Sequence, residues 1–122
     1  MRCPNLILLY VDNPLASATL YSDLFGKEPT DIHPTFVSFT LESDLMVGLW
    51  SKHTAQPTAL TTGGGGELCF SAADEQTVNL MYQQWTHKGC RVAQKPIMLD
   101  FGYTFVVLDP DGHRLRVFHP KS

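Results

Sequence analysis

The 122-residue chain has few cysteines and no run of basic residues. Cys3, Cys69 and Cys90 are an odd number of thiols, and no two of them have Cys-x-x-Cys spacing. The sequence therefore indicates neither a disulfide framework nor a zinc knuckle. The formal net charge is −3, from 9 basic and 12 acidic residues. This balance argues against nucleic acid as a partner.

Long apolar segments are also missing. No stretch approaches the roughly 20 apolar residues that a membrane-spanning helix needs. The first residues lead directly into a strand-like run, without the cleavage site of a secretory signal. We therefore expect a cytoplasmic protein that makes no contact with a membrane.

The usual motifs of catalysis and nucleotide binding are absent. The four glycines at residues 63–66 lack the Lys-Ser/Thr of a phosphate loop, and there is no Gly-x-Gly-x-x-Gly. No two of the five histidines have the i, i+4 spacing of a helical metal pair. Because catalytic triads are recognised by geometry, the sequence alone supports no catalytic residue.

Apolar sequence, in contrast, is sufficient for one domain with its own core, since 43% of the residues are hydrophobic. A continuous apolar run at residues 6–11 predicts a strand covered on both faces. Asn13 and Pro14 then suit the start of a helix, which Gly26 ends. Two further strands are expected at residues 35–41 and 45–50, on either side of a turn. We interpret the first half as a β-α-β-β-β pattern, of which these segments locate three of the four strands.

The same pattern repeats after a polar, glycine-rich linker at about residues 53–65. A strand at 67–72 precedes a helix that begins after Asp74 and ends at Gly89. A short strand at 90–93 is then followed by a break at Lys95-Pro96. Residues 103–108 and 113–119 form a hairpin around Asp109-Pro110-Asp111-Gly112, whose residues favour a tight turn. We interpret the chain, residues 1–122, as one domain of two modules, at about 4–52 and 66–120.

Three motifs, in this order, resemble the vicinal oxygen chelate superfamily, also called the glyoxalase/bleomycin resistance/dioxygenase fold. They are Val11-Asp12-Asn13-Pro14 leading to Leu20-Tyr21-x-x-Leu24-Phe25-Gly26, the second strand-helix unit ending at Gly89, and Asp109-Pro110-Asp111-Gly112-His113-Arg114-Leu115. The resemblance covers essentially the whole chain. It implies an α+β fold of two βαβββ modules, with an eight-stranded curved sheet around a cavity, in a homodimer.

The resemblance also indicates where metal-dependent members hold their ligands. The matching positions are Leu6, Gly48 or a neighbour, Glu67 and Arg116. Leucine and glycine have no side-chain donor, and arginine has only N–H donors and a permanent positive charge. A catalytic divalent cation needs about three protein ligands. We therefore expect no metal and no other cofactor, and none of the chemistry that depends on the metal.

Strand alternation divides the side chains between two faces, and the resemblance implies which set lines the cavity. That set is Leu6, Leu8, Tyr10, Met46, Gly48, Trp50, Glu67, Cys69, Ser71, Arg114, Arg116 and Phe118. Five aromatic residues nearby are further candidates: Phe36, Phe39, Phe101, Tyr103 and Phe105. A shift of one residue in the register of their strands would reverse their faces.

From these sets we predict seven ligand-binding residues: Phe36, Met46, Gly48, Trp50, Glu67, Tyr103 and Arg116. The aromatic rings would stack on a planar ligand, and Gly48 would let a flat ring approach the backbone. Glu67 and Arg116 would orient the ligand or form a structural ion pair. Trp50 also suits a core or a dimer interface, and Tyr103 also suits edge-strand packing.

The leading hypothesis is a metal-free protein that sequesters a hydrophobic aromatic compound, an antibiotic or toxin, and confers resistance by binding it. It resembles the bleomycin- and phenazine-binding members of the superfamily. A second hypothesis is a divergent lyase, isomerase or dioxygenase relative that uses Glu67, with His33 or His53 supplied by the loops. A third is a regulatory module whose cavity is filled by its own side chains.

Overall fold

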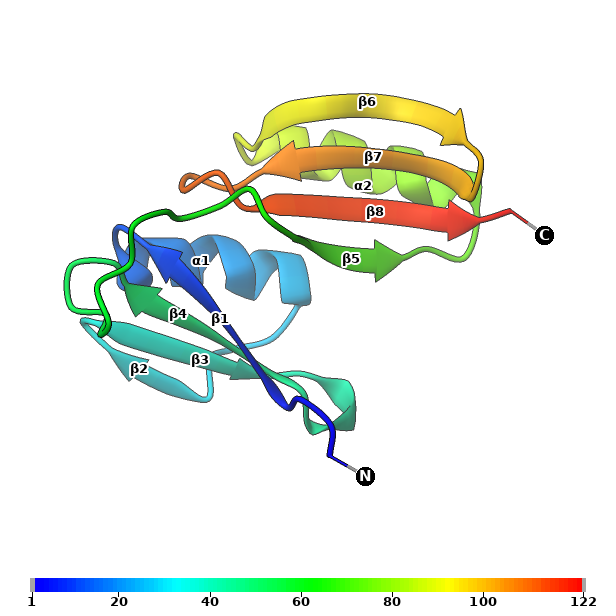
Figure 1. The fold of residues 1–122 in the computed structure, drawn as a ribbon. Coiled ribbons are helices and arrows are strands. Elements are labelled where there is room, and N and C mark those ends of the chain that lie inside the picture. Colours follow the sequence, from blue (N-terminus) through cyan, green and yellow to red (C-terminus); the bar gives the residue numbers. More distant parts are fainter. Residues whose placement is uncertain (1, 122) are drawn as a thin grey trace. The chain divides into compact units, whose positions relative to one another are not determined.

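The computed structural model describes residues 2–121, and its contacts divide the chain into two units, Met1–Thr62 and Gly63–Ser122. Each unit contains one mixed four-stranded sheet and one α-helix (Figure 1). The predicted α+β fold of two βαβββ modules is therefore confirmed, with four strands in each sheet. None of the helices in residues 2–121 has the length and apolar character to span a bilayer.

The first unit contains a sheet with the strand order β1-β4-β3-β2. The strands are β1 (Leu6–Val11), β2 (Asp31–His33), β3 (Phe36–Thr40) and β4 (Met46–Ser51). The chain also forms helix α1 (Pro14–Phe25) and a short 3-10 turn, η1 (Glu42–Asp44). Strand β1 runs parallel to β4, and the other neighbours are antiparallel. We call this the first sheet.

Helix α1 begins and ends at the residues that the sequence predicts. The Asn13 side chain accepts a hydrogen bond from the backbone N–H of Ala16, and Pro14 occupies the first turn. Gly26 adopts a left-handed conformation (φ 66°) and its N–H donates to the Ser22 carbonyl. The apolar side of α1 packs on the first sheet, where the rings of Phe25 and Phe39 meet edge to face. One face of the first sheet is thus covered.

The second unit has the same topology, with the strand order β5-β8-β7-β6. The strands are β5 (Glu67–Ser71), β6 (Arg91–Leu99), β7 (Gly102–Leu108) and β8 (Arg114–Pro120), and the helix is α2 (Glu75–His87). Strand β5 runs parallel to β8, as β1 does to β4. We call this the second sheet.

Helix α2 covers one face of the second sheet through aromatic packing. Trp85 contacts Phe70 of β5 and Phe105 of β7 edge to face, and Tyr82 also contacts Phe105. Asp74 caps the helix by accepting from the N–H of Thr77 at 2.7 Å. The helix predicted between Asp74 and Gly89 therefore packs on the sheet through its aromatic side chains.

Strand β6 differs from its prediction. The sequence predicts a short strand at 90–93 and a break at Lys95-Pro96, but β6 runs for nine residues. Its pairing with β7 shifts register twice, between Val92 and Gln94 and between Gln94 and Ile97. Because β6 is an edge strand, these irregularities accommodate a proline, which has no N–H to donate. The proline therefore bends the pairing instead of ending the strand.

The hairpin between β7 and β8 is held by one buried carboxylate. Asp109 Oδ1 accepts from the backbone N–H groups of Asp111 and His113, each at 2.8 Å. Gly112 takes the positive φ (82°) that the turn requires. The backbone of Gly63 lies against this turn: a Cβ there would be 2.2 Å from the Gly112 carbonyl. The first glycine of the predicted linker is therefore fixed by close packing.

Candidate functional site

Each sheet has one face under its helix and one face that the helix leaves uncovered, which we call the open face. In the first sheet, Val37, Phe39, Val47 and Leu49 are fully buried on the helix side. Strand alternation then puts Met46, Gly48 and Trp50 on the open face. Their register partners on β1 are Leu6, Leu8 and Tyr10, and those on β3 are Thr40, Ser38 and Phe36.

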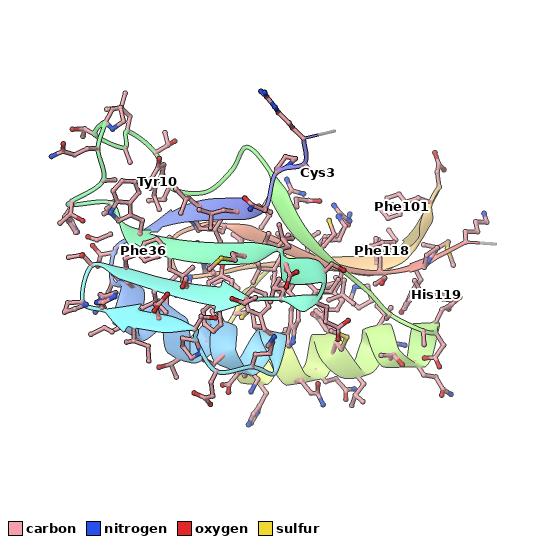
Figure 2. All side chains as sticks on the ribbon, turned by 90° about the horizontal axis from the view of Figure 1, so that it is seen from below. Cys3, Tyr10, Phe36, Phe101, Phe118 and His119 are labelled. Atoms are coloured by element: carbon pink, nitrogen blue, oxygen red, sulfur yellow. The ribbon has the colours of Figure 1, made fainter. Side chains whose placement is uncertain are left out.

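Aromatic rings gather at one end of this open face. Tyr10 and Trp50 lie on neighbouring strands with ring centroids 6.2 Å apart, and Phe36 is the partner of Trp50 on β3. Figure 2 labels Tyr10 and Phe36 at this end of the first unit. The predicted residues Phe36, Met46, Gly48 and Trp50 therefore share one face.

Gly48, however, has a different role from the one the sequence suggests. The expectation is that its bare backbone admits the flat ring of a ligand. A Cβ at Gly48 would instead lie 2.8 Å from Phe36 Cζ and 2.8 Å from Leu8 Cδ2. The space beside Gly48 is thus filled by the chain's own Phe36 ring and Leu8.

The open face of the second sheet is arranged in rows across the strands. One row consists of Glu67, Arg114, Leu108 and Arg91; the next of Cys69, Arg116, Val106 and Gln94; and the third of Ser71, Phe118, Thr104 and Ile97. Directly paired residues lie on the same face of a sheet. The face therefore changes from cationic in the first row to largely apolar in the third.

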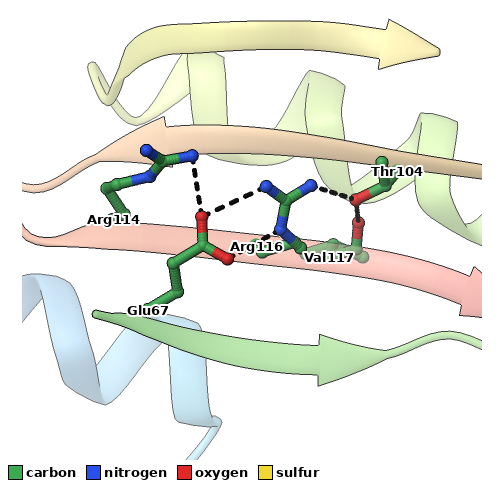
Figure 3. A network of polar contacts seen from close by, with 5 residues as sticks. All are labelled: Glu67, Thr104, Arg114, Arg116 and Val117. Carbon is green, nitrogen blue, oxygen red and sulfur yellow. Dashed lines mark hydrogen bonds and ion pairs between the residues drawn. The ribbon is translucent and has the colours of Figure 1, made fainter. Parts of the chain in front are cut away.

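Glu67 is the centre of a polar network on this face (Figure 3). Arg116 donates to both of its carboxylate oxygens, from Nε at 2.8 Å and from Nη2 at 3.1 Å. Arg114 Nη2 lies 2.8 Å from Glu67 Oε2. The third nitrogen of Arg116, Nη1, donates to Thr104 Oγ1 at 3.1 Å, and that hydroxyl donates to the Val117 carbonyl. One carboxylate is shared by two guanidinium groups.

This network lowers the pKa of Glu67. The hydrogen bond from Arg116 is the main cause, and partial burial acts in the opposite direction. The neighbouring thiol responds differently, because burial and the Glu67 charge raise the pKa of Cys69. At neutral pH, Glu67 is a weak base and Cys69 a protonated thiol.

The four positions that the resemblance matches to metal ligands do not fit a divalent cation. Leu6 and Gly48 offer no donor atom, and Arg116 offers only N–H groups. Both oxygens of Glu67 are already bound to guanidinium groups. No group of three His, Cys, Asp or Glu side chains among residues 2–121 is placed to hold a metal.

A cavity of about 380 Å³ opens on the same face, lined by Glu67, Cys69, Phe101, Arg116 and Phe118. The rings of Phe101 and Phe118 meet edge to face with centroids 6.3 Å apart. The Arg116 guanidinium carbon lies 5.6 Å from the Phe101 ring centroid, a cation-π distance. Figure 2 labels both rings at this end of the second unit. The cavity thus combines aromatic walls with one charged pair.

Two of these residues are predicted ligand contacts, Glu67 and Arg116. Phe101 and Phe118 are not among the seven predicted contacts. Phe118 does belong to the predicted cavity-lining set, because it lies two residues beyond Arg116 on the same strand and therefore on the same face. Phe101 is one of the five further aromatic candidates, and it lies in the turn before β7, where no periodic pattern assigns a face.

The structure places the Tyr103 side chain away from this cavity. Its hydroxyl donates to Asn79 Oδ1 of α2 at 2.7 Å, which places the side chain on the helix-covered face. Phe105 contacts α2 in the same way, and Phe39 contacts α1. Thr104 faces the open side instead and hydrogen-bonds Arg116. Tyr103 and Thr104 are neighbours on β7 and therefore point to opposite faces. A shift of one residue in the register of this strand would be needed to bring Tyr103 to the cavity side.

A second cavity, of about 440 Å³, lies in the loop after β4 and is lined by Lys52, His53, Ala59, Leu60, Thr61 and Thr62. His53 Nε2 is 2.8 Å from Asp12 Oδ1, and Lys52 Nζ is 4.0 Å from the same oxygen. The hydrogen bond with His53 lowers the pKa of Asp12. This cluster is solvent-exposed, and its lining residues include no Phe, Tyr or Trp.

The folds of the two units agree with the comparisons to known proteins. The chain belongs to the glyoxalase/bleomycin resistance protein/dioxygenase superfamily, whose family model matches residues 4–117. It is 32% identical, over 93% of its length and 89% of the relative's, to the phenazine antibiotic resistance protein EhpR of Enterobacter agglomerans.

Solved structures have the same fold. A protein from Agrobacterium tumefaciens, determined by solution NMR, is 43% identical with a TM-score of 0.92, and the match covers 100% of both chains. A glyoxalase-related enzyme from Fulvimarina pelagi is 21% identical with a TM-score of 0.86, and the match covers 98% of this chain and 88% of that one. At that identity the second match supports the fold alone.

Proposed function

We propose that the protein binds a planar aromatic small molecule on the open face of the second sheet and confers resistance by sequestering it. The observation that carries this proposal is the cavity between Phe101, Phe118 and the Glu67–Arg116 pair. Apolar walls with a few fixed polar groups suit a flat organic ligand. The similarity to a phenazine antibiotic resistance protein over nearly the whole chain supports a role in resistance.

The chemistry of the cavity favours binding over conversion. A general base must be able to accept a proton, yet Glu67 is held ionised by two arginines and its pKa is lowered. A nucleophilic cysteine needs a low pKa, yet the pKa of Cys69 is raised. The side chains around the cavity can therefore stack on a ligand and orient it.

We also propose a cytoplasmic homodimer. Cytoplasmic location is supported by Cys3, Cys69 and Cys90, which are all free thiols, as is usual in a reducing compartment. The dimer is supported by β1, an edge strand of the first sheet on which Leu6, Ile7 and Leu8 are exposed. Exposed apolar edge strands are sites of association. Light scattering coupled to size-exclusion chromatography would give the mass directly.

The test of binding is calorimetric titration with phenazine, followed by recovery of the compound and its mass. We expect Phe118→Ala to weaken binding by about 1–3 kcal/mol, because it removes one aromatic wall. Tyr103→Phe is the matched control, since it changes the adjacent strand only on the helix-covered face. Trp50→Ala asks whether the aromatic rings of the first sheet also contribute.

Phenazine recovered unchanged and bound with the expected dependence on Phe118 would support sequestration. If the recovered compound has a different mass, the protein converts phenazine, and an enzymatic function takes the place of sequestration. If the wild type and Phe118→Ala bind phenazine with equal affinity, the ligand does not bind in this cavity.

A further inference from the structure

The open face of the second sheet carries more positive charge than its own ion pair uses. Its described strands contribute Arg91, Arg114 and Arg116 but only one carboxylate, Glu67. The chain as a whole has a net charge of −3, so this local excess runs against the average charge of the molecule. Because these arginines cluster beside an aromatic cavity, we ask whether they have a role in binding in addition to keeping the surface soluble.

The two arginines nearest the cavity are used differently. Arg116 donates from all three of its nitrogens, to Glu67 and Thr104, and its side chain is 14% exposed. Arg114 reaches Glu67 through Nη2 alone and is 43% exposed. Within residues 2–121, its Nε is buried and has no hydrogen-bond partner. Arg116 is therefore committed to the fold, whereas Arg114 retains donors for another anion.

Glu67 is the acidic side chain that contacts both arginines. Its two oxygens accept from Arg116, and one of them also lies 2.8 Å from Arg114 Nη2. One negative charge therefore faces two guanidinium groups, and the network of these three side chains is positively charged overall.

The spacing of the rows gives the shape of a ligand that would use both features. Residues two apart on a strand are separated by about 7 Å, so the Phe118 row and the Arg114 row are about 13 Å apart. A ligand whose ring lies at the Phe118 row would therefore reach the Arg114 row through an anionic substituent directed toward it and through the length of the arginine side chain. Its ring would lie against Phe101 and Phe118, and its carboxylate would reach the guanidinium of Arg114.

We propose that the ligand class is an anionic aromatic compound, with Arg114 as the residue that selects the negative charge. This inference rests on the proposed function, since it needs an aromatic ligand in this cavity. Arginine suits the role because its planar N–H groups match a carboxylate. The contact is charge-assisted and partly shielded from water, so it discriminates between a carboxylate and a neutral group of the same shape.

The experiment compares phenazine-1-carboxylate with phenazine-1-carboxamide, which have nearly the same shape and differ in charge. We expect the carboxylate to bind at least about tenfold more tightly to the wild type, a preference that falls as salt is added. Arg114→Gln should remove the preference, because it weakens binding of the carboxylate far more than binding of the carboxamide. Arg114→Lys, which keeps the charge, should restore part of it.

Arg91→Gln is the matched control, because it removes the same charge from the same row but two strands away. It should leave most of the preference intact. Equal binding of the two compounds to the wild type, or a preference that survives Arg114→Gln, would overturn the selection of charge but leave aromatic binding standing. Binding of neither compound would overturn both proposals together.

Discussion

The ring of Phe36 lies against the backbone of Gly48, at the place where any side chain at residue 48 would begin. The two residues are on neighbouring antiparallel strands of the first sheet, and Leu8 closes the same space from β1. A side chain at residue 48 would therefore displace the ends of the Phe36 and Leu8 side chains, whether or not a ligand binds there.

Gly48→Ala should destabilise the protein by less than about 1 kcal/mol, because the added methyl group would be 2.8 Å from the ends of the Phe36 and Leu8 side chains, which can move aside on this face. Urea unfolding followed by tryptophan fluorescence measures the change. Gly65→Ala is the control, since a Cβ at Gly65 has no atom within 4 Å. If the clash is the cause, adding Phe36→Leu should reduce the penalty of Gly48→Ala; additive effects would argue against it.

Acid should weaken the second unit through Glu67. Its pKa is lowered in the folded protein, so the carboxylate contributes stability above its unfolded pKa, near 4.5, and loses it as the pH falls through the folded value. Glu67→Gln should therefore be less stable than the wild type at pH 7, by about 1–3 kcal/mol. The difference should shrink at pH 3. Glu28→Gln, at an exposed position, should show no such convergence.

The β7–β8 turn should depend on the carboxylate of Asp109. Asp109→Ala removes the acceptor of two backbone N–H groups, one of them in a buried setting, and should cost about 1–3 kcal/mol. Asp109→Asn retains a side-chain oxygen in the same place and should recover much of the loss. Thermal unfolding of the three proteins provides the comparison, and equal losses in both variants would mean that the negative charge, not the acceptor, holds the turn.

Ligand in the cavity should protect Cys69 from alkylation. The thiol lines the cavity, whereas Cys3 is exposed near the N-terminus and Cys90 follows α2. With excess phenazine, the rate of Cys69 modification by iodoacetamide should fall several-fold, and that of Cys3 should not change. Peptide mass spectrometry resolves the three sites in a single sample. Equal rates for Cys69 with and without bound phenazine would place the ligand elsewhere.

Local chemistry explains which parts of the fold could be predicted from the sequence. Asn13, Pro14 and Gly26 determine the ends of α1 through their own backbone and capping preferences. The turn at residues 109–112 is equally self-contained. Such features need no knowledge of the rest of the molecule.

The errors arise where a neighbouring strand decides the outcome. Pro96 predicts the end of a strand, but an edge position and two register shifts allow β6 to continue. Tyr103 and Thr104 exchange faces if the register moves by one residue, and the sequence around them is apolar on both sides. Phe101, in a turn, reaches the cavity only through tertiary packing.

The packing of Gly63 against the β7–β8 turn also marks where the chain could be divided. Gly63 donates its N–H to the Asp111 carbonyl and leaves no room for a side chain, so it belongs to the second half. To produce two fragments for complementation, the chain should therefore be cut before Gly63, within residues 56–62. A tag inserted into the chain should be placed in the same segment. A cut two residues later would remove Gly63, which packs on the β7–β8 turn, from the second fragment.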